Sequence, residues 1–450
     1  MHSLHNNTDE TALKDQSVNC CWRPLREDEY GLVSTPTYPR SRLANYGVAV
    51  DLGTSHIRLS LWDLQTKTRL TGITGLNPQS SYGTDVLIRL MLAMRSPETA
   101  QDISRLAQTA IGQGLAQVVS TLDIDKSDID EVLVVGNTAM LTLLSGKNHG
   151  ALLQPENWTA RVDCLPDDSA KFRRIWGVSD SASIDFIVPV GGFVGSDLLA
   201  GVVATQLTKQ PRGSLLIDFG ANSEIALWDG RSILVTSVAG GPAFEGSGIS
   251  CGMPGETGAV YRVKANDDHR LELKVLGDGE PKGLCGSGLV DSVAILRRNG
   301  QLDRIGRLSG GKGKSGVMLH SNACQISLNG LDIDMFQRAK AAIAASVIWL
   351  CDLAGIRISE IKGAHACGAF GQLLDVANAQ FVGLLPQLPV GAVALQGNTA
   401  LAGCEMLLLS DQRSETLKSL LDVTHVHNMG EELSFEPLFI ENLYLQPIHD

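Results

Sequence analysis

The stretch LLIDFGANSEIALWD at residues 215–229 decides the fold. An apolar run leads to Asp218, the chain turns at Gly220, and a second apolar run follows over Glu224–Trp228. Short apolar runs on both sides of a glycine turn are typical of two strands that form a hairpin. We therefore expect a buried hairpin whose turn begins with the pattern Asp-x-Gly.

An earlier stretch repeats this design. It reads VAVDLGTSHIRLSLWD at residues 48–63, and it also joins two apolar runs through an Asp-x-Gly turn. When the two stretches are aligned, Asp51 falls on Asp218 and Gly53 falls on Gly220. Two matched hairpins predict two similar halves of the chain that face each other.

An Asp-x-Gly hairpin is suited to binding a phosphate. The glycine lets the backbone approach the phosphate without a Cβ in the way, and successive amides of the turn donate to its oxygens. The aspartate at the strand end can bind Mg²⁺, usually through water, because Mg²⁺ loses its water reluctantly. A single turn of this kind is common in hairpins, whereas two matched ones after apolar strands predict a nucleotide cleft.

The composition indicates a globular protein. The chain has 450 residues, 44% of them hydrophobic and 19% charged, with a net charge of −12. Helical stretches rich in Ala and Leu alternate with short Val, Ile and Leu runs, which favours an α/β architecture. The acidic balance argues against a general nucleic-acid binder. No apolar run reaches the ~18 residues of a membrane span and no secretory signal is evident, so we expect no membrane partner and a cytoplasmic protein.

The nine cysteines are scattered along the chain. Most lie in apolar or glycine-rich surroundings, which favours free thiols in a reducing compartment over a disulfide framework. Cys251 and Cys285 lie in glycine-rich loops and invite a metal interpretation. Two thiols supply at most half of a tetrahedral site, so packing as small apolar residues is the favoured interpretation.

Three regions follow from these patterns: a polar tail at 1–45, a first half at 46–210, and a second half at 211–450. Outside the hairpins we expect a strand at Glu131–Val135 and a strand pair over Tyr261–Val275. The C-terminal run FEPLFIENLYLQP alternates apolar and polar residues and predicts an edge strand. The spacing of apolar residues predicts helices at Asp85–Met94, Gln101–Leu122, Leu198–Leu207, Leu289–Arg298, Asp334–Ala354 and Asn398–Leu409. No further helix is predicted after Leu409.

A third glycine element, HACGAFG, spans His365–Gly371 between an expected strand and a helix. Its glycines could bring backbone against an adenine or a ribose. The alternative is a helix start with small residues for packing. If this element stood alone, we would prefer the packing interpretation. Because it occurs together with the two hairpins, we prefer the nucleotide interpretation.

The two hairpins and this late turn together resemble the phosphate-1, phosphate-2 and adenosine elements of the sugar kinase, heat-shock protein and actin ATPases. A narrower resemblance, from about Tyr46 to the C-terminus, is to the ATPase domain of the reductive activators of corrinoid proteins. It rests on motifs in the expected order, including VVGNTAMLTLLSG, GGFVGSDLLAG, AGGPAFEGSGISCGM, GLCGSGLVD and FVGLLP. It implies an α/β fold of two actin-like, ribonuclease H-like halves around a nucleotide cleft.

The resemblance also implies a function. Corrinoid cofactors work as Co(I) and are sometimes lost to inactive Co(II). Members of this family use ATP binding and hydrolysis to promote the reduction back to Co(I). The expected cofactors are ATP and Mg²⁺, and the expected partner is a corrinoid protein or corrinoid methyltransferase. The chain could also pair with a second copy of itself as a homodimer.

The sequence departs from the family in two places. Well-known members carry an iron–sulfur domain with four cysteine ligands, and the 45-residue tail is too short and too poor in cysteine to supply one. We therefore predict no iron–sulfur cluster in this chain and a separate electron donor. His56 stands where relatives usually have threonine or another small polar residue.

The resemblance implies roles for particular residues. Asp51 and Asp218 would organise Mg²⁺ and the attacking water. The glycine-rich loop after the second hairpin would close on the nucleotide, and the late glycine turn would back the adenosine. The residues expected to contact the nucleotide are Gly53, Thr54, Ser55, Gly220, Ala221, Asn222, Gly240, Gly241, Glu245, Gly368 and Gly371.

Two further acids have two interpretations each. Glu224 lies on the return strand, where it could act as a general base or be a solvated or salt-bridged side chain. Asp197 follows a glycine-rich stretch, where it could bind Mg²⁺ or cap the next helix.

Two alternative functions stay open from the sequence. One is a small-molecule kinase, which would need a base beside an acceptor pocket. The other is a non-catalytic protein that uses nucleotide as a conformational switch or assembles a corrinoid system.

Overall fold

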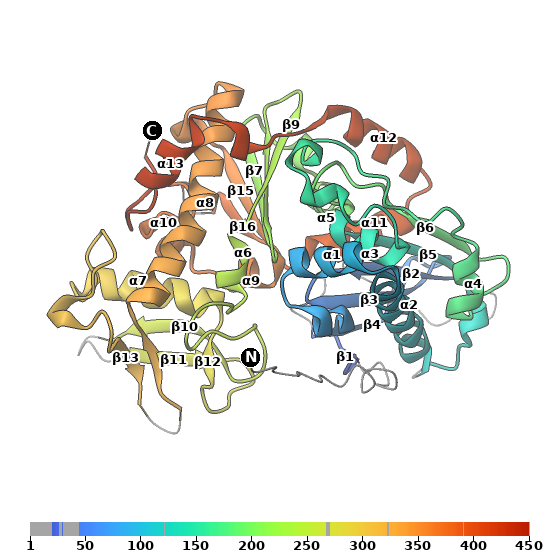
Figure 1. Ribbon diagram of the computed structural model, residues 1–450, viewed down its shortest axis with the longest axis horizontal. Helices are drawn as coiled ribbons and strands as arrows, with labels where there is room; N and C mark the ends of the chain where they lie inside the picture. Colours follow the sequence, from blue (N-terminus) through green and yellow to red (C-terminus); the bar gives the residue numbers. More distant parts are fainter. Residues whose placement is uncertain are drawn as a thin grey trace, which may run out of the picture.

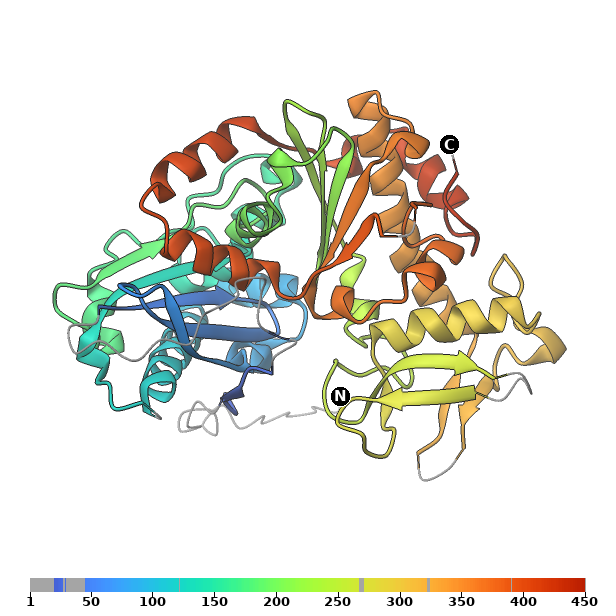
Figure 2. The same cartoon turned by 180° about the vertical axis from the view of Figure 1, so that it is seen from behind.

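The computed structural model describes residues 20–26, 29, 45–120, 122–266, 271–321, 324–389 and 391–449. Two six-stranded sheets, each flanked by helices, form the two lobes seen in Figures 1 and 2. Most of the predicted tail lies outside the described residues. None of the helices within the described ranges is long and apolar enough to cross a membrane.

The first sheet has the order β1-β4-β3-β2-β5-β6. Strands β2, β3 and β4 are antiparallel neighbours, and β5 and β6 continue the sheet parallel to β2. We call this sheet and its helices the first lobe. Its strands are β1 (Arg23–Pro24), β2 (Tyr46–Leu52), β3 (His56–Asp63), β4 (Thr68–Leu76), β5 (Ile129–Gly136) and β6 (Ser183–Phe186).

The second sheet repeats this topology except at one edge, where β17 is parallel to β9 but β1 is antiparallel to β4. Its order is β16-β15-β7-β8-β9-β17, with β7, β8 and β9 antiparallel and with β15 and β16 parallel to β7. We call it and its helices the second lobe. Its strands are β7 (Ser214–Phe219), β8 (Ser223–Trp228), β9 (Ile233–Val238), β15 (Gly363–Cys367), β16 (Val393–Leu395) and β17 (Thr424–Val426). The two matched hairpins predicted from the sequence are thus β2–β3 and β7–β8, at equivalent places in two similar sheets.

Amphipathic helices cover one face of the first sheet. The expected helices at 85–94 and 101–122 are confirmed as α1 (Val86–Arg95) and α2 (Pro97–Ser120), followed later by α3 (Thr138–Ser145). Asp85 and Asn137 accept backbone N–H groups at the starts of α1 and α3, as N-cap residues do. The weakly patterned region after α3 contains one short helix, α4 (Lys171–Trp176), whose Trp176 is fully buried.

Two helices are shared between the lobes. Helix α5 (Ser196–Thr205) follows the first sheet, yet Leu199 packs in a core with residues of β7, β8 and β9. Helix α11 (Thr399–Leu408) follows the second sheet, yet Leu401 and Leu407 pack on Ala49 and other residues of the first sheet. Figure 2 shows α11, in orange-red, lying across the blue strands of the first sheet.

The second lobe carries a smaller subdomain, at the lower left of Figure 1. The predicted strand pair over 261–275 is confirmed as the antiparallel β10 and β11. Helix α8 begins four residues earlier than expected because Asn329 caps it, accepting the N–H groups of Leu331 and Asp332. The remaining elements are α6 (Gly241–Phe244), β10 (Ala259–Ala265), β11 (Leu271–Val275), β12 (Gly283–Leu284), α7 (Gly286–Arg298), β13 (Val317–His320), β14 (Ile326–Leu328), α8 (Gly330–Ala354), α9 (Gly368–Gln372) and α10 (Val376–Phe381).

The C-terminal region differs from the sequence prediction. The run at 435–447 is not an edge strand; it contains α13 (Phe435–Glu441), which packs on α8. Its less exposed residues, Phe435, Leu438 and Phe439, recur at steps of three and four, so the run fits a helical period as well as an alternating one. Pro437 lies in the first turn, where proline is tolerated. Helix α12 (Arg413–Val423) was not expected after α11.

Candidate functional site

The first hairpin places Asp51 opposite Arg58. The two residues pair in the register of β2 and β3, and Arg58 Nη1 lies 3.3 Å from Asp51 Oδ2. Asn398, the N-cap residue of α11, donates its Nδ2 to the same oxygen at 2.7 Å. Asp51 is therefore held by one donor from its own hairpin and one from the far end of the chain.

The turn of the first hairpin is tied down through its carbonyl groups. The side chain and the backbone amide of Asn77 donate to the carbonyl oxygens of Gly53 and Ser55, each at 2.9 Å. Arg89 Nη1 donates to the carbonyl oxygen of Thr54 at 2.9 Å. Gly53 uses its own amide to close the turn on the His56 carbonyl. The amides of Thr54 and Ser55 donate to no group among the described residues, so they are free to bind a ligand.

The second hairpin places Asp218 opposite Glu224. These two carboxylates pair in the register of β7 and β8, at the positions that Asp51 and Arg58 occupy in the first lobe. Glu224 is only 8% exposed and makes no ion pair within the described part of the chain, so the solvated or salt-bridged interpretation is wrong. Ser237 Oγ donates to its Oε1 at 3.1 Å.

The turn of the second hairpin also has open amides. For Gly220, Ala221 and Asn222, no hydrogen bond from the amide to another described residue is present. The carbonyl groups of this turn face the glycine-rich loop instead, since a Cβ on Gly241 would lie 1.7 Å from the Gly220 oxygen. Gly240 packs on α8, where a Cβ would lie 3.0 Å from Ile343 Cγ1. These two glycines let the loop pack closely against the second turn and against helix α8.

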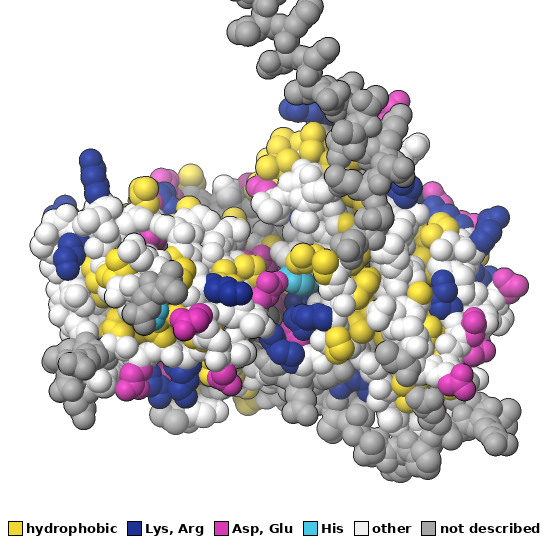
Figure 3. Space-filling view, turned by 90° about the horizontal axis from the view of Figure 1, so that it is seen from below, with side chains coloured by type: hydrophobic (Ala, Val, Ile, Leu, Met, Phe, Trp, Pro, Cys, Tyr) yellow, Lys and Arg dark blue, Asp and Glu magenta, His cyan; other side chains and the backbone are white. Residues whose placement is uncertain are grey.

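Side chains from the two lobes meet beside the hairpins. Ser55 Oγ donates to Glu245 Oε2 at 3.3 Å, and His56 Nε2 lies 3.8 Å from Glu256 Oε1. Figure 3 shows acidic, basic and histidine side chains gathered at this boundary. The structure thus brings the predicted residues of the first turn and of the glycine-rich loop into direct contact.

The carboxylates at the boundary repel one another. Burial, and after it the Asp51 carboxylate, raises the pKa of Asp218 to about 6. Burial, followed by Asp218 and Asp51, raises the pKa of Asp197 to about 8. Burial, followed by Asp197 and Asp218, raises the pKa of Glu224 well above its usual value. Burial also raises the pKa of Glu245, although Ser55 and Arg58 act against it. Such a cluster favours the arrival of a cation.

Asp197 is not the N-cap residue of α5, because that position is Gly195. Asp197 lies in the first turn of α5, where its Oδ1 accepts the Leu198 amide at 3.0 Å. It is also close enough to Asp51 and Asp218 for their charges to raise its pKa.

The acids suit Mg²⁺ bound together with a nucleotide. Among the described residues, no three His, Cys, Asp or Glu side chains converge so that they could hold a metal ion by themselves. Mg²⁺ commonly takes one or two carboxylates and fills its other positions with water and phosphate oxygens. Asp51 and Asp218 match that requirement. Cys251 and Cys285 instead donate to the carbonyl oxygens of Ser327 and Val260, which supports packing.

The third glycine element borders the second hairpin. Gly368 has φ +85°, and a Cβ there would lie 3.0 Å from Asp218 Oδ1. This position favours glycine because both the backbone conformation and the close carboxylate oppose a side chain. Gly371 packs α9 against β15, with the place of its Cβ 2.7 Å from the Ala366 carbonyl carbon. Its contacts are thus with the protein, while Gly368 is next to Asp218.

Sequence reasoning missed four polar residues of the site. Arg58 and Asn398 hold Asp51, while Asn77 and Arg89 hold the first turn. A signal was present for Asn398, since asparagine before an apolar helical run is typical of an N-cap. Nothing local in the sequence indicates that Arg89 reaches the turn 35 positions away.

The fold and the paired hairpins define the class of protein: a two-lobed actin-like, or ASKHA, protein. Residues 212–449 match the family described as the C-terminal domain of RACo, the ASKHA domain, and residues 46–210 match the RACo middle region. The chain belongs to this family, the reductive activators of corrinoid proteins.

Three known proteins are similar to the chain. A corrinoid activation enzyme, RamQ, of Eubacterium limosum is 30% identical over 88% of this chain and 69% of its own length. A Co(II) methylated amine-specific corrinoid protein reductase of Methanosarcina barkeri is 29% identical over 82% of this chain and 71% of its own. The solved structure of a reductive activator for corrinoid, iron–sulfur protein has a TM-score of 0.77 and 26% identity, covering 91% of this chain and 67% of that one.

Proposed function

We propose that this protein is an ATP-dependent activator of a corrinoid protein or corrinoid methyltransferase. It binds ATP with Mg²⁺ between its two hairpins and uses hydrolysis to promote the reduction of inactive Co(II) corrinoid to Co(I). The electrons come from a separate donor. The names of the two curated relatives, one an activation enzyme and one a Co(II) corrinoid protein reductase, support the assignment.

One observation carries this proposal. Equivalent turns in the two lobes present free amides, and the aspartates beside them are close enough to raise the pKa of Asp218. Free amides suit phosphate oxygens, and paired carboxylates suit the Mg²⁺ that accompanies them.

Residue roles follow from position. The amides of Thr54, Ser55, Ala221 and Asn222 donate to phosphate oxygens, and Asp51 and Asp218 hold Mg²⁺ through water. When bound, Mg²⁺ neutralises charge on the phosphates. Asp218 and Glu224 orient a water and take its proton in this proposal, which is supported by their opposite positions in the register of β7 and β8. Gly368 and Gly371 place the late turn for the adenosine.

The contacts between the lobes suggest how hydrolysis reaches the partner. Ser55–Glu245 and His56–Glu256 each join the first turn to the second lobe, so a change in the phosphates changes how the lobes meet. Domain closure around a ligand is a common way to convert such a local event into a movement. The partner corrinoid protein would bind one of the two lobe arrangements better than the other.

The test is Asp218→Asn, with Asp411→Asn at an exposed site as the matched control. We expect the first variant to lose roughly 10²-fold or more of its ATP hydrolysis, as when a charged group that acts in the transition state is removed. It should also lose ATP-dependent bleaching of the Co(II) spectrum of a corrinoid protein in the presence of a chemical reductant. The control should keep both.

Unchanged hydrolysis and reactivation in Asp218→Asn would contradict the two-hairpin mechanism. ADP release that requires an added small-molecule acceptor would indicate a kinase instead. Nucleotide-dependent partner binding without any turnover would indicate a switch or assembly protein.

A further inference from the structure

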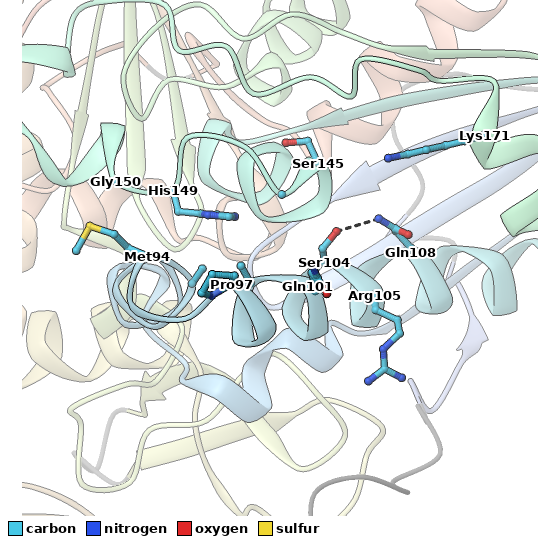
Figure 4. Close-up of a pocket in the computed structure, with 13 residues that line it drawn as sticks. Met94, Pro97, Gln101, Ser104, Arg105, Gln108, Ser145, His149, Gly150 and Lys171 are labelled. Atoms are coloured by element: carbon cyan, nitrogen blue, oxygen red, sulfur yellow. Dashed lines mark hydrogen bonds between the residues drawn. The ribbon is translucent and has the colours of Figure 1, made fainter.

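A cavity of about 730 Å³ lies in the first lobe, away from the two hairpins. It is bounded by the end of α1, one face of α2 and the chain that follows α3, and Figure 4 shows the residues that line it. Pockets of this size accommodate small organic ligands.

The polar wall of the cavity combines one inward cation, Lys171, with the imidazole of His149, whose pKa is lowered by burial. The cavity's 13 lining residues include Arg105, His149 and Lys171 but no aspartate or glutamate, although the whole chain has a net charge of −12. Figure 4 shows Lys171 and the His149 ring extending toward the space above α2 from opposite sides, while Arg105 points away. Arg105 is paired with Asp102 at 2.8 Å.

Neither inward group has a hydrogen-bond or ion-pair partner in the part of the chain that the structure describes. Lys171 makes no ion pair with any acid in the described ranges, and its Nζ lies 5.2 Å from the centre of the Phe172 ring. His149 Nε2 is buried and has no hydrogen-bond partner among the residues that the structure describes. Buried polar atoms are normally paired, so this Nε2 atom is available to a group that enters the cavity. Gln108 is already used, since its Nε2 donates to Ser104 Oγ at 2.9 Å.

The wall at the α1 end of the cavity, beside His149, is apolar. Ala93, Met94, Pro97 and Ala100 line it, and Met94 is 56% exposed. A ligand that satisfies both walls needs an anionic end and an apolar part.

Both walls connect to the turn of the first hairpin. Helix α1 has Met94 at the cavity and Arg89 on the carbonyl oxygen of Thr54. Helix α3 has Ser145 at the cavity and, at its other end, the N-cap Asn137, whose Nδ2 donates to Thr54 Oγ1 at 2.9 Å. Any shift of these two short helices at the cavity therefore reaches Thr54.

We propose that this cavity binds a small organic anion with an apolar part, held by Lys171 and His149, and that its occupancy is coupled to nucleotide binding through Thr54. The binding stands on the cavity alone. The coupling rests on the proposed nucleotide site as well. An effector and a nucleotide that are coupled must alter each other's affinity by the same factor.

The test is calorimetric titration of the full chain, without nucleotide, with hexanoate, phenyl phosphate and hexylamine. We expect one or both anions to bind and hexylamine not to bind, and the comparison of hexanoate with phenyl phosphate tells carboxylate from phosphate ligands. Lys171→Met should weaken anion binding at least tenfold. Arg174→Met removes the same charge from an exposed site on the same helix, outside the cavity, and should change nothing.

Failure of both anions to bind, or equal losses in the two methionine variants, overturns the binding site. His149→Asn, which should also weaken binding, provides a second reading if Lys171→Met folds poorly. Repeating the titration with saturating ATP and Mg²⁺ tests the coupling, for which we expect at least a threefold change in anion affinity. A separate titration of the chain with ATP and Mg²⁺ first establishes that the nucleotide binds. If it binds and the anion affinity is unchanged, the coupling is overturned and the cavity site stands, whereas a lack of ATP binding contradicts the nucleotide site.

Discussion

The two aspartates of the site have different neighbours despite their equivalent positions. Asp51 faces a cation, Arg58, and also accepts Asn398, whereas Asp218 faces a second acid, Glu224. The first lobe thus stabilises the charged Asp51 carboxylate, whereas in the second lobe the Asp218 carboxylate is repelled by the acids around it. The second lobe is therefore where a bound cation would change protonation most.

This difference predicts how pH acts on stability. Because the folded-state pKa of Asp218 is raised to about 6, its protonated form favours the folded state. Its destabilising effect begins above the unfolded pKa near 4, grows through pH 6 and is then constant. The stability of Asp218→Asn relative to wild type should therefore rise by roughly 1–3 kcal/mol as the pH increases from 4 to 8. Thermal melts of both proteins across this range measure the difference.

The comparison with the variant is needed because Lys340 acts in the opposite direction. Burial lowers the pKa of this lysine to about 7, so it destabilises the folded state less as the pH rises from 7 toward 10. The wild-type curve also reflects other buried acids, such as Asp291, whose pKa is raised to about 6 chiefly by burial. The difference between the two proteins retains only Asp218 and the acids whose pKa it raises, Asp197 and Glu224. Parallel curves for wild type and Asp218→Asn would show that Asp218 titrates normally. Added Mg²⁺ should stabilise the wild type more at pH 8 than at pH 5.5.

At the scale of elements, the crossing of α5 and α11 sets how closely the lobes approach. Gly403 in α11 lies against Ala200 in α5, where a Cβ would be 1.8 Å from the Ala200 carbonyl oxygen. The side chain of glycine is only a hydrogen atom, so the two helices can touch at this position. The same two helices carry Asp197 and the N-cap Asn398 into the site.

Gly403→Ala should push the two helices apart. Overpacking of a tight contact costs about 1–3 kcal/mol, and here the obstacle is backbone that cannot rotate away. We expect a loss of that size in urea unfolding together with weaker ATP binding, since Asn398 would withdraw from Asp51. Gly313→Ala adds the same methyl group where nothing lies within 4 Å and serves as the control. Wild-type stability in Gly403→Ala would mean that the helices can separate freely.

Most of the elements could be predicted because their apolar spacing is local. The hairpins and the helices α1, α2 and α8 carry regular periods that a window of sequence reveals. The run at 435–447 fits two periods, and only packing on α8 decides between them. Asn398 and Arg89 are in the site because of contacts over 347 and 35 positions, which no local pattern records. Arg58, in contrast, lies opposite Asp51 in the same hairpin, so its place depends on the register of that hairpin. The aspartates and glycines of the hairpins could be named because chemistry demands those residue types.

At the scale of the whole molecule, the lobes meet through the shared helices α5 and α11 and, near the hairpins, also through polar contacts. His56 takes part in one of these polar contacts with Glu256. This side chain adds a contact between the lobes beside the turn of the first hairpin.

His56→Gln should loosen this junction. Without nucleotide the variant should have a larger radius of gyration than wild type in small-angle X-ray scattering, and Mg²⁺ with ATP should bring the two values together. His425→Gln replaces an exposed histidine on the edge strand β17 and should leave the scattering unchanged. Identical curves for His56→Gln and wild type would show that other contacts hold the lobes.

The exchange of helices between the lobes also governs how the chain folds during synthesis. The face of the first sheet that carries Ala49, Trp62 and Leu133 is covered by α11. Asp51 and its partner Asn398 are separated by 347 positions, so the ribosome completes the first sheet long before its cover emerges. A nascent chain must keep this apolar face from aggregating until nearly all of the protein has been made. Chaperone dependence and sensitivity to C-terminal truncation follow from that delay.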